Sequence, residues 1–388
     1  MSHLKRLRPE AVAAPSSGIL AVIQYAFGRD GLLPLWAGEG DLPTPDFIRA
    51  AAAEGLARGE TFYTYQRGLP ELRQALADYT QALYGQPQSP DRFFVTGSGM
   101  QAIQIALTAL TGAGDEIVYF GPAWPNLPAA AALRGVKPVE VAFDPIAGGW
   151  QLDLDKVRDA IGEKTRALFV NTPANPTGWT ATYQELEALR DMAREAGIAI
   201  IADEIYSQFY YVGERAPSFH DVMSEEDTIF FVNSFSKNWA MTGWRVGWIE
   251  APVKFDEVIA NLIQYSTSGV AAFMQRGAIA AIREGGAFVE EQTARAKIAR
   301  DLFCNRLLAT NRVALSPPDG AFYAFFSIDG IEDTRQAAFR IIDEANVGLA
   351  PGTAFGTAAP QFLRACFHRR LDEVEMAAER LADWIGAA

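Results

Sequence analysis

The chain of 388 residues is poor in the side chains that build metal centres and disulfide frameworks. It has two cysteines, Cys304 and Cys366, which stand far apart and form no CxxC pair. Its three histidines, His3, His220 and His368, share no ligand spacing. Because a zinc site needs clustered thiolate or imidazole ligands and a disulfide framework needs paired cysteines, the sequence predicts neither.

Basic clusters and long apolar runs are also missing. The formal net charge is −13 and the basic residues are scattered, which is the wrong pattern for binding a phosphate backbone. No run of eighteen apolar residues occurs, so we expect no membrane span. Near the N-terminus, Pro9, Glu10 and the break over residues 15–18 interrupt the apolar core of a signal peptide. We therefore expect a cytoplasmic protein that binds neither nucleic acid nor membrane.

What the chain does contain is a long alternation of strand and helix patterns. With 49% hydrophobic and 21% charged residues, the composition is that of a globular protein, and the length suits two domains. Between about residues 90 and 247, short apolar runs alternate with helical patterns: DRFFVTG, MQAIQIALTAL, DEIVYFG, RALFVNT, YQELEALRDMAREAG, IAIIADE and TIFFVNS. This predicts an α/β fold with a mostly parallel sheet flanked by helices.

The pattern changes at both chain ends. The first 45 residues hold the helix-like SGILAVIQYAF and the segment LWAGEGDLPTP. The last hundred hold a charged helical pattern around residues 290–308 and two strand-like runs, GAFYAFFSI and QFLRACF. We infer a large domain over residues 46–285 and a smaller α+β domain from residues 1–45 and 286–388, with the boundary within residues 279–293.

Ligands of an open parallel sheet bind beyond the carboxyl ends of its strands, so the residues after each apolar run are site candidates. Ser98, Gly99 and Met100 follow FFVTG where a helix opens, and backbone amides there suit a phosphate. GSGMQA also matches the dinucleotide fingerprint GxGxxG/A. The acidic partner of that fingerprint is missing, since Asp115 and Glu116 precede the next strand, IVYF, instead of ending it. A nicotinamide site is therefore the weaker alternative.

Four more polar or aromatic residues follow later strands. Trp124, after VYF, either packs in the core or stacks on a planar ring. Asn175, between two prolines, is either an ordinary turn residue or a rigidly held hydrogen-bonding group. Asp203, after IAIIA, is costly to bury without a cation such as a protonated ring nitrogen, and Tyr206 is either a surface phenol or part of the same site.

The segment NSFSKNWAMTGWR follows TIFFV and supplies hydroxyls and two cations, namely Ser234, Ser236, Lys237 and Arg245. Burying an amine is costly unless an interaction compensates for it, so the simplest interpretation of Lys237 is a solvated loop residue. For Arg245 the corresponding alternative is a structural ion pair. We therefore expect one crevice to contain an anion site, an indole, a carboxylate, a phenol, an amine and a guanidinium.

In this combination and order, the motifs resemble those of the class I/II aminotransferases, pyridoxal-phosphate enzymes of fold type I. The resemblance covers nearly the whole chain, through LWAGEGDLPTP, YTYQRGLPELRQAL, VTGSGMQAI, NTPANPTG, ADEIY, SFSKNWAMTGWRVGW, GAFYAF and LRACF. It implies a transaminase that uses pyridoxal 5'-phosphate and moves an amino group from an L-amino acid to a 2-oxo acid by a ping-pong mechanism.

The resemblance also implies residue roles. Lys237 would form a Schiff base with the cofactor and then act as the general base, and Asp203 would keep the pyridine nitrogen protonated. Tyr206 and Asn175 would hydrogen-bond the ring oxygen, and Trp124 would stack on the ring. The phosphate would be held by Ser98, the amides of Gly99 and Met100, Ser234, Ser236 and Arg245.

Three more residues belong to this comparison. Arg364, in QFLRACF, would clamp the substrate α-carboxylate, and Gly38, in WAGEG, would let a backbone amide approach the same group. Tyr63 would reach the phosphate in the neighbouring subunit, which implies a homodimer. Because Tyr65 is so close, either tyrosine could be the residue that matches the family position. The alternative to these roles is core packing for the tyrosines and solvation for Arg364.

The resemblance leaves the substrate and the reaction open. Some aspartate-specific relatives carry a lysine at the position of Met100, and Trp36 and Trp124 offer apolar lining, which favours a neutral or apolar donor. β-Elimination by C-S lyases and the synthesis of cyclopropane amino acids use the same apparatus. Transcription regulators with an aminotransferase-like domain also carry a preceding DNA-binding domain, for which we expect no room because the family pattern begins within the first 40 residues.

Overall fold

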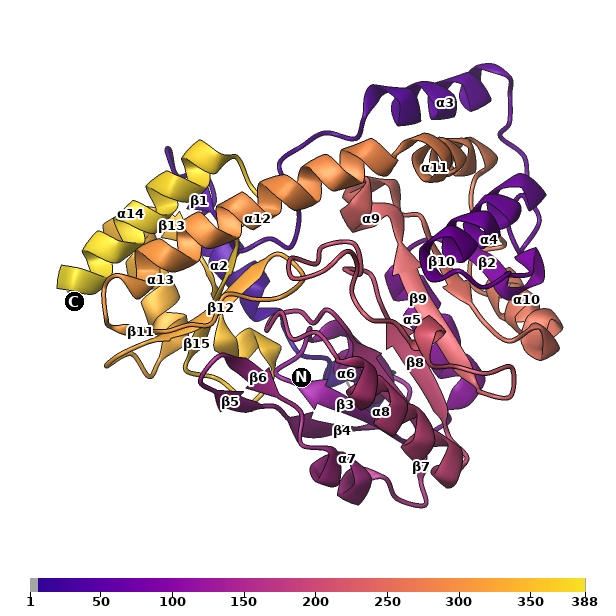
Figure 1. Cartoon of the computed structure of the whole chain (residues 1–388), viewed down its shortest axis with the longest axis horizontal. Coiled ribbons are helices and arrows are strands. Elements are labelled where there is room, and N and C mark those ends of the chain that lie inside the picture. The colour runs from indigo at the N-terminus through magenta and orange to yellow at the C-terminus, as the bar shows by residue number, and fades with distance from the viewer. Residues whose placement is uncertain (1–5, 388) are drawn as a thin grey trace.

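The computed structural model describes residues 6–387, so His3 and the start of the basic N-terminal stretch lie outside it (Figure 1). Its larger sheet has seven strands in the order β2-β10-β9-β8-β7-β3-β4. Neighbours run parallel except β10, which is antiparallel to β2 and β9. The mostly parallel sheet is therefore confirmed. In sheet order the strands are Phe93–Thr96, Gly247–Glu250, Ile229–Ser234, Ala199–Asp203, Thr165–Asn171, Glu116–Gly121 and Lys137–Ala142.

Helices cover both faces of this sheet, which explains why its strands are apolar throughout. Along β3, Ile117 and Tyr119 pack into one core, whereas Val118 and Phe120 pack into the core on the other face. The first core is closed by α5 (Gly99–Leu110), α6 (Asn126–Ala132) and α10 (Asp256–Gln264). The second is closed by α7 (Leu154–Ala160) and α8 (Tyr183–Ala196).

A smaller antiparallel sheet has the order β11-β12-β15-β14 (Val313–Ala314, Tyr323–Ile328, Phe362–Cys366, Ala350–Pro351). Its core includes side chains from α12 (Gly286–Leu308), α13 (Thr334–Ala345) and α14 (Leu371–Ala387). Val22 of α2 (Gly18–Tyr25) and Leu35 belong to the same core, and β1 (Leu33–Pro34) pairs with β13 (Val347–Gly348). Both chain ends thus share one core, while the exact division at residues 46–285 stays a prediction.

Figure 1 shows α12 running from α11 (Ala272–Glu284), beside the large sheet, to α14, beside the smaller one. A third core at the β2 edge is closed by α3 (Asp46–Ala57), α4 (Pro70–Tyr84) and α11. The remaining elements are α1 (Pro9–Val12), α9 (Phe235–Asn238), the β5/β6 hairpin (Asp144–Ile146, Gly149–Gln151) and the single turns η2 (Pro90–Arg92), η3 (Phe219–Asp221), η4 (Thr242–Trp244), η5 (Val253–Phe255) and η6 (Gly352–Phe355). Among residues 6–387, no helix has both the length and the apolar character needed to cross a membrane.

Candidate active site

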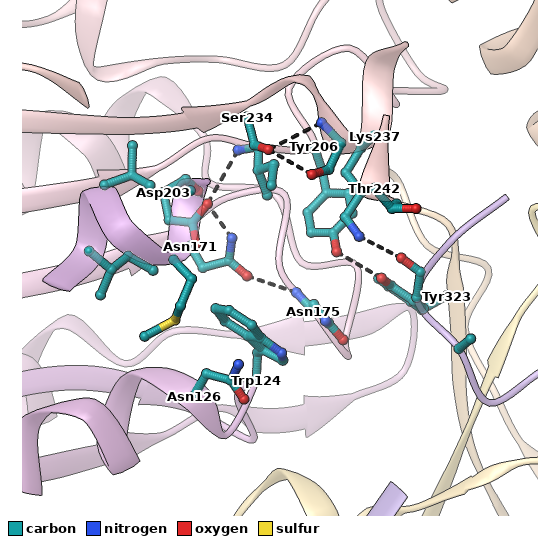
Figure 2. Close-up of a pocket in the computed structure, with 18 of the residues that line it drawn as sticks. Trp124, Asn126, Asn171, Asn175, Asp203, Tyr206, Ser234, Lys237, Thr242 and Tyr323 are labelled. Atoms are coloured by element: carbon teal, nitrogen blue, oxygen red, sulfur yellow. Dashed lines mark hydrogen bonds between the residues drawn. The ribbon is translucent and has the colours of Figure 1, made fainter. Parts of the chain in front are cut away.

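A cavity of about 420 Å³ lies between the carboxyl ends of the large sheet and residues of the smaller sheet (Figure 2). Asn171, Asp203 and Ser234 in its wall are the last residues of β7, β8 and β9. The predicted site residues that line the cavity are Gly38, Gly99, Met100, Trp124, Asn175, Asp203, Tyr206, Ser234, Ser236, Lys237, Arg245 and Arg364. Candidates from both chain ends and from the central block therefore meet at one place.

Lys237 enters this cavity from the single turn α9, directly after β9. Its Nζ donates a hydrogen bond to the carbonyl oxygen of Gly38 at 2.5 Å. Burial of the amine lowers the pKa of Lys237 to about 8, and the positive charges of Arg364 and Arg245 act in the same direction. A substantial neutral fraction near pH 8 suits an amine to nucleophilic chemistry, which the solvated alternative would not explain.

Asp203 is a buried carboxylate that has no ion-pair partner in the part of the chain that the structure describes. Its Oδ1 accepts a hydrogen bond from the amide of Ile205 at 3.3 Å, and within residues 6–387 no lysine, arginine or histidine forms an ion pair with it. Burial, the largest cause, raises the pKa of Asp203 to about 7, and the neighbouring charge of Glu204 adds to it. A cationic ring nitrogen in the cavity would supply the missing counter-charge.

The N-terminus of α5 lies at one end of the cavity. Ser98 caps this helix, because its Oγ accepts from the amide of Gln101 at 3.0 Å, and Gly99 and Met100 begin it. Gly247 of β10 allows the helix to start here, since a side chain on it would lie 2.7 Å from the amide nitrogen of Gly99. Backbone amides at a helix N-terminus favour a phosphate.

Ser234, Ser236 and Arg245 surround the same end. The Ser234 hydroxyl donates to Ser236 Oγ at 2.8 Å, and the amide of Ser236 donates back to Ser234 Oγ at 3.1 Å. Arg245 has a left-handed backbone with φ of 54°, and its Nη1 donates to the carbonyl of Thr242 at 2.7 Å. Its other guanidinium nitrogens stay free for an anion, so the ion-pair alternative for Arg245 has no support among the described residues.

Arg364 of β15 is 2% exposed and reaches the cavity from the smaller sheet. Its Nη1 donates to Asn175 Oδ1 at 3.0 Å, and its Nη2 donates to the carbonyl of Trp36. Its Nε is buried and has no hydrogen-bond partner among residues 6–387. A buried guanidinium with an unused donor is suited to an anionic ligand, so solvation does not explain this arginine.

Tyr206 and Asn175 line the same cavity, as Figure 2 shows, and Asn175 is the residue that accepts from Arg364. The Tyr206 hydroxyl is 2.7 Å from the hydroxyl of Tyr323, and Lys237 Nζ lies 5.9 Å from the centre of the Tyr206 ring. The amide of Asn175 donates to Asn171 Oδ1 at 2.9 Å, and its carbonyl accepts from the amide of Trp124 at 2.9 Å. This chain of bonds fixes the loop after β7 against the backbone of Trp124.

Two predicted residues do not line the cavity. Ser98 is buried at the helix cap, with its hydroxyl used by α5. Tyr63 is 94% exposed and lies on another surface, where residues 61–64 neighbour residues 267–271. Tyr65, the alternative in that register, is 68% exposed. Core packing therefore explains neither tyrosine within this chain.

Sequence reasoning missed several lining residues. Tyr323 and Asn171 make hydrogen bonds at the site, and Thr242 and Asn126 add polar groups to its wall. Asn171 could have been found, since it ends a strand like Asp203. Tyr323 is one aromatic residue within an apolar strand and carries no local signal. The other additional lining residues are Ile19, Ala37, Ile103, Ile205 and Val232, whereas Trp36, which the sequence analysis offered as apolar lining, is found in the wall as expected.

Comparisons with known proteins agree on one class. Residues 31–381 match the family model described as aminotransferase class I and II. The chain is 33% identical over 390 residues to an aspartate/prephenate aminotransferase of Thermus thermophilus, covering 100% of this chain and 98% of the relative. It is 32% identical over 371 residues to aromatic-amino-acid aminotransferase 2 of Thermococcus litoralis, covering 94% of each. The structure of an alanine aminotransferase from Pyrococcus furiosus superposes with a TM-score of 0.92 at 27% identity, covering 98% of this chain and 100% of that one.

These matches define an enzyme that transfers amino groups. The chain belongs to the aminotransferase class I and II family, and both its predicted fold type and its cofactor, pyridoxal 5'-phosphate, are confirmed. The residues present fit this cofactor, because the unpaired Asp203 lacks a cation that a protonated pyridine would provide. The start of α5 and Arg245 likewise suit a phosphate.

Proposed function

We propose that this protein moves the amino group of a neutral or apolar L-amino acid to a 2-oxo acid by a ping-pong mechanism. One observation supports it above all: the Lys237 amine, the unpaired Asp203 carboxylate and the Arg364 guanidinium with its unused Nε line one cavity. Pyridoxal phosphate, when bound, supplies an electron-withdrawing ring that stabilises negative charge on the substrate Cα.

In this proposal Lys237 would hold the cofactor covalently through its amine, and the same amine would move the proton at the substrate Cα. Both roles need an amine that is neutral near working pH, and burial lowers its pKa to about 8. The bond from Nζ to the Gly38 carbonyl holds the amine in the cavity. The same contact places the backbone of Gly38 beside the reacting groups.

The ring is held by four side chains. Asp203 pairs with the ring nitrogen, and Trp124 stacks on the ring. Tyr206 and Asn175 donate to the ring oxygen. Because Asn175 Oδ1 accepts from Arg364, the amide NH₂ of Asn175 is left free to donate, as this role requires.

The phosphate is held at the start of α5. The amides of Gly99 and Met100 face it, supported by the positive end of the helix dipole, and Arg245 offers free guanidinium donors. Ser98 contributes by capping the helix, and the hydroxyls of Ser234 and Ser236 complete the set.

Arg364 binds the substrate α-carboxylate, assisted by the backbone of Gly38. The substrate side chain then meets apolar groups, because Ile19, Trp36 and Met100 line the wall. The cations that the described residues place in this wall are Lys237, Arg245 and Arg364, and each already has a role. None is left for a distal carboxylate, which supports a neutral or apolar donor.

We further propose a homodimer in which Tyr63 contributes to the partner's cofactor site. Phe62, Tyr63 and Tyr65 are 84%, 94% and 68% exposed, and Tyr265 is 88% exposed. A hydrogen bond from Thr64 Oγ1 to the carbonyl of Val270, at 2.8 Å, joins the two segments that carry these aromatic residues. Exposed aromatic groups in one place are typical of an interface.

The proposal is tested by reducing the holoenzyme with borohydride and mapping the adduct by peptide mass spectrometry. We expect the cofactor on Lys237, no adduct in Lys237→Ala, and an unchanged adduct in Lys254→Ala, which removes an exposed lysine outside the cavity. An adduct on another lysine, or one retained in Lys237→Ala, would overturn the assignment.

A further inference from the structure

Tyr323 is fully buried at the start of β12, between groups of both sheets. Its hydroxyl lies 2.7 Å from that of Tyr206, and its ring faces the Arg364 guanidinium carbon at 4.5 Å. Gly38 makes room for it, because a side chain on Gly38 would lie 2.4 Å from the Tyr323 hydroxyl oxygen. Tyr323 therefore touches Tyr206, proposed to hold the ring oxygen, as Figure 2 shows, and also Arg364, proposed to hold the substrate carboxylate.

The two hydroxyls hold two protons between them, and this limits how they bond. Each phenol donates one hydrogen bond and accepts others. If Tyr206 donates to the cofactor ring oxygen, it cannot also donate to Tyr323. The bond between the two oxygens then requires Tyr323 to donate to Tyr206.

We propose that Tyr323 is a positioning residue that donates its proton to Tyr206 and thereby directs the Tyr206 proton to the ring oxygen of the cofactor. This inference rests on the proposed function. A hydroxyl that accepts a hydrogen bond becomes a stronger donor, by roughly 10–30% per bond. Tyr323 thus tunes the cofactor through Tyr206 without touching it.

The Schiff base of the holoenzyme reports on this relay. A donor to the ring oxygen stabilises its negative charge most when the Schiff-base nitrogen has lost its proton, so it lowers the Schiff-base pKa. Tyr206→Phe should raise that pKa by about one unit or more, as expected for a hydrogen bond to a charged oxygen. Tyr323→Phe should raise it by roughly 0.1 to 0.3 unit for each unit that Tyr206→Phe raises it, because only the polarisation of Tyr206 is lost.

The test is a spectrophotometric pH titration of the holoenzyme Schiff base in both single variants and in the double variant. If Tyr323 acts through Tyr206, Tyr323→Phe shifts the pKa in the wild-type background and not in the Tyr206→Phe background. The charged and titratable groups around the pair are Arg364, Lys237, Asp203 and Cys366, and all variants retain them.

Tyr211→Phe is the matched control. Tyr211 is also buried, its hydroxyl donates to the carbonyl of Ala321, and Arg300 stacks on its ring at 4.7 Å, but it lies outside the cavity. It should leave the Schiff-base pKa unchanged. Tyr323→Leu separates ring from hydroxyl, since it should also raise KM by removing the surface against Arg364.

Two results would overturn the relay: no shift in Tyr323→Phe, or an equal shift in both backgrounds. The relay and the proposed function fail distinguishably. A wild-type holoenzyme without a titrating Schiff base would reject the function itself. If the wild type titrates and Tyr323→Phe leaves the Schiff-base pKa unchanged, only the relay is rejected.

Discussion

Arg364 and Asn175 are hydrogen-bonded to each other across the cavity, with Nη1 of the arginine 3.0 Å from Oδ1 of the amide. The arginine comes from the smaller sheet and the amide from the loop after β7. The bond therefore joins the proposed substrate clamp to the proposed cofactor clamp. It also orients both groups, because the amide oxygen is occupied while Nε of the arginine is unused.

Replacing Arg364 by lysine keeps the charge but loses the planar fork. We expect kcat/KM for amino donors to fall about 10- to 100-fold, mainly through KM, because charge-assisted bonds to the carboxylate are lost in both ground and transition states. Steady-state kinetics with Arg364→Lys measures this. Arg369→Lys is the control, since Arg369 bonds the carbonyl of Pro34 outside the cavity. An unchanged KM would remove Arg364 from substrate binding.

Asp203→Asn should separate catalysis from stability. In the holoenzyme we expect turnover to fall about 100-fold or more, because the ring nitrogen loses its counter-charge. In the apoprotein the carboxyl has a pKa of about 7, against 3.8 unperturbed, so the folded state binds its proton more tightly than the unfolded chain. The wild type therefore loses stability through this group as pH rises from about 4 to about 7.

Chemical denaturation of both apoproteins across this pH range measures the effect. Between pH 4 and 7, the free energy of unfolding of Asp203→Asn should increase relative to that of the wild type. Above pH 7 the difference between the two proteins should stay constant. Glu204, whose pKa burial also raises to about 7, is present in both proteins, and the repulsion between its charge and that of Asp203 is part of the difference that is measured. A gap independent of pH would mean that Asp203 is not a buried, unpaired carboxyl.

The strand-end residues could be predicted from sequence because each follows an apolar run, and parallel strands bring their ends to one edge. Lys237 and Asp203 were found in this way. Tyr323 could not be found, because its position at the site depends on how the two sheets pack and not on its place within an apolar strand. Ile19 likewise lines the cavity only because α2 packs beside it. The choice between Tyr63 and Tyr65 could not be made either, because in the proposed dimer it would depend on a second chain.

The proposed contribution of Tyr63 across the dimer predicts complementation. Lys237→Ala should be inactive, and Tyr63→Ala should bind the cofactor more weakly. In a mixed dimer, one site combines Lys237 of one chain with Tyr63 of the other and is intact. Co-expression with two tags and purification of the mixed dimer should therefore recover activity close to half that of the wild type.

Activity of the mixed dimer near the average of the two parent variants would contradict a contribution in trans. Tyr65→Ala in place of Tyr63→Ala resolves the register, since only the tyrosine that reaches the partner's site should complement. Size-exclusion chromatography with light scattering checks that each variant still forms a dimer.

The donor preference follows from the cavity wall. We expect kcat/KM for neutral or apolar amino acids to exceed that for aspartate, because Met100 cannot pair with a distal carboxylate. Met100→Lys should raise the ratio of aspartate to leucine activity about two- to fivefold, the effect of one partly exposed ion pair. Met376→Lys, at an exposed position on α14, controls for the added charge. A wild-type preference for aspartate would contradict the proposed donor class.

The central claim, transamination at Lys237, is tested most directly by the absorption spectrum of the holoenzyme during addition of single amino acids without a 2-oxo acid. We predict loss of the band of the Lys237-bound cofactor, one equivalent of keto acid per subunit, and return of the band when a 2-oxo acid is added. A band that persists while keto acid and ammonia accumulate far beyond one equivalent would contradict transamination and indicate β-elimination.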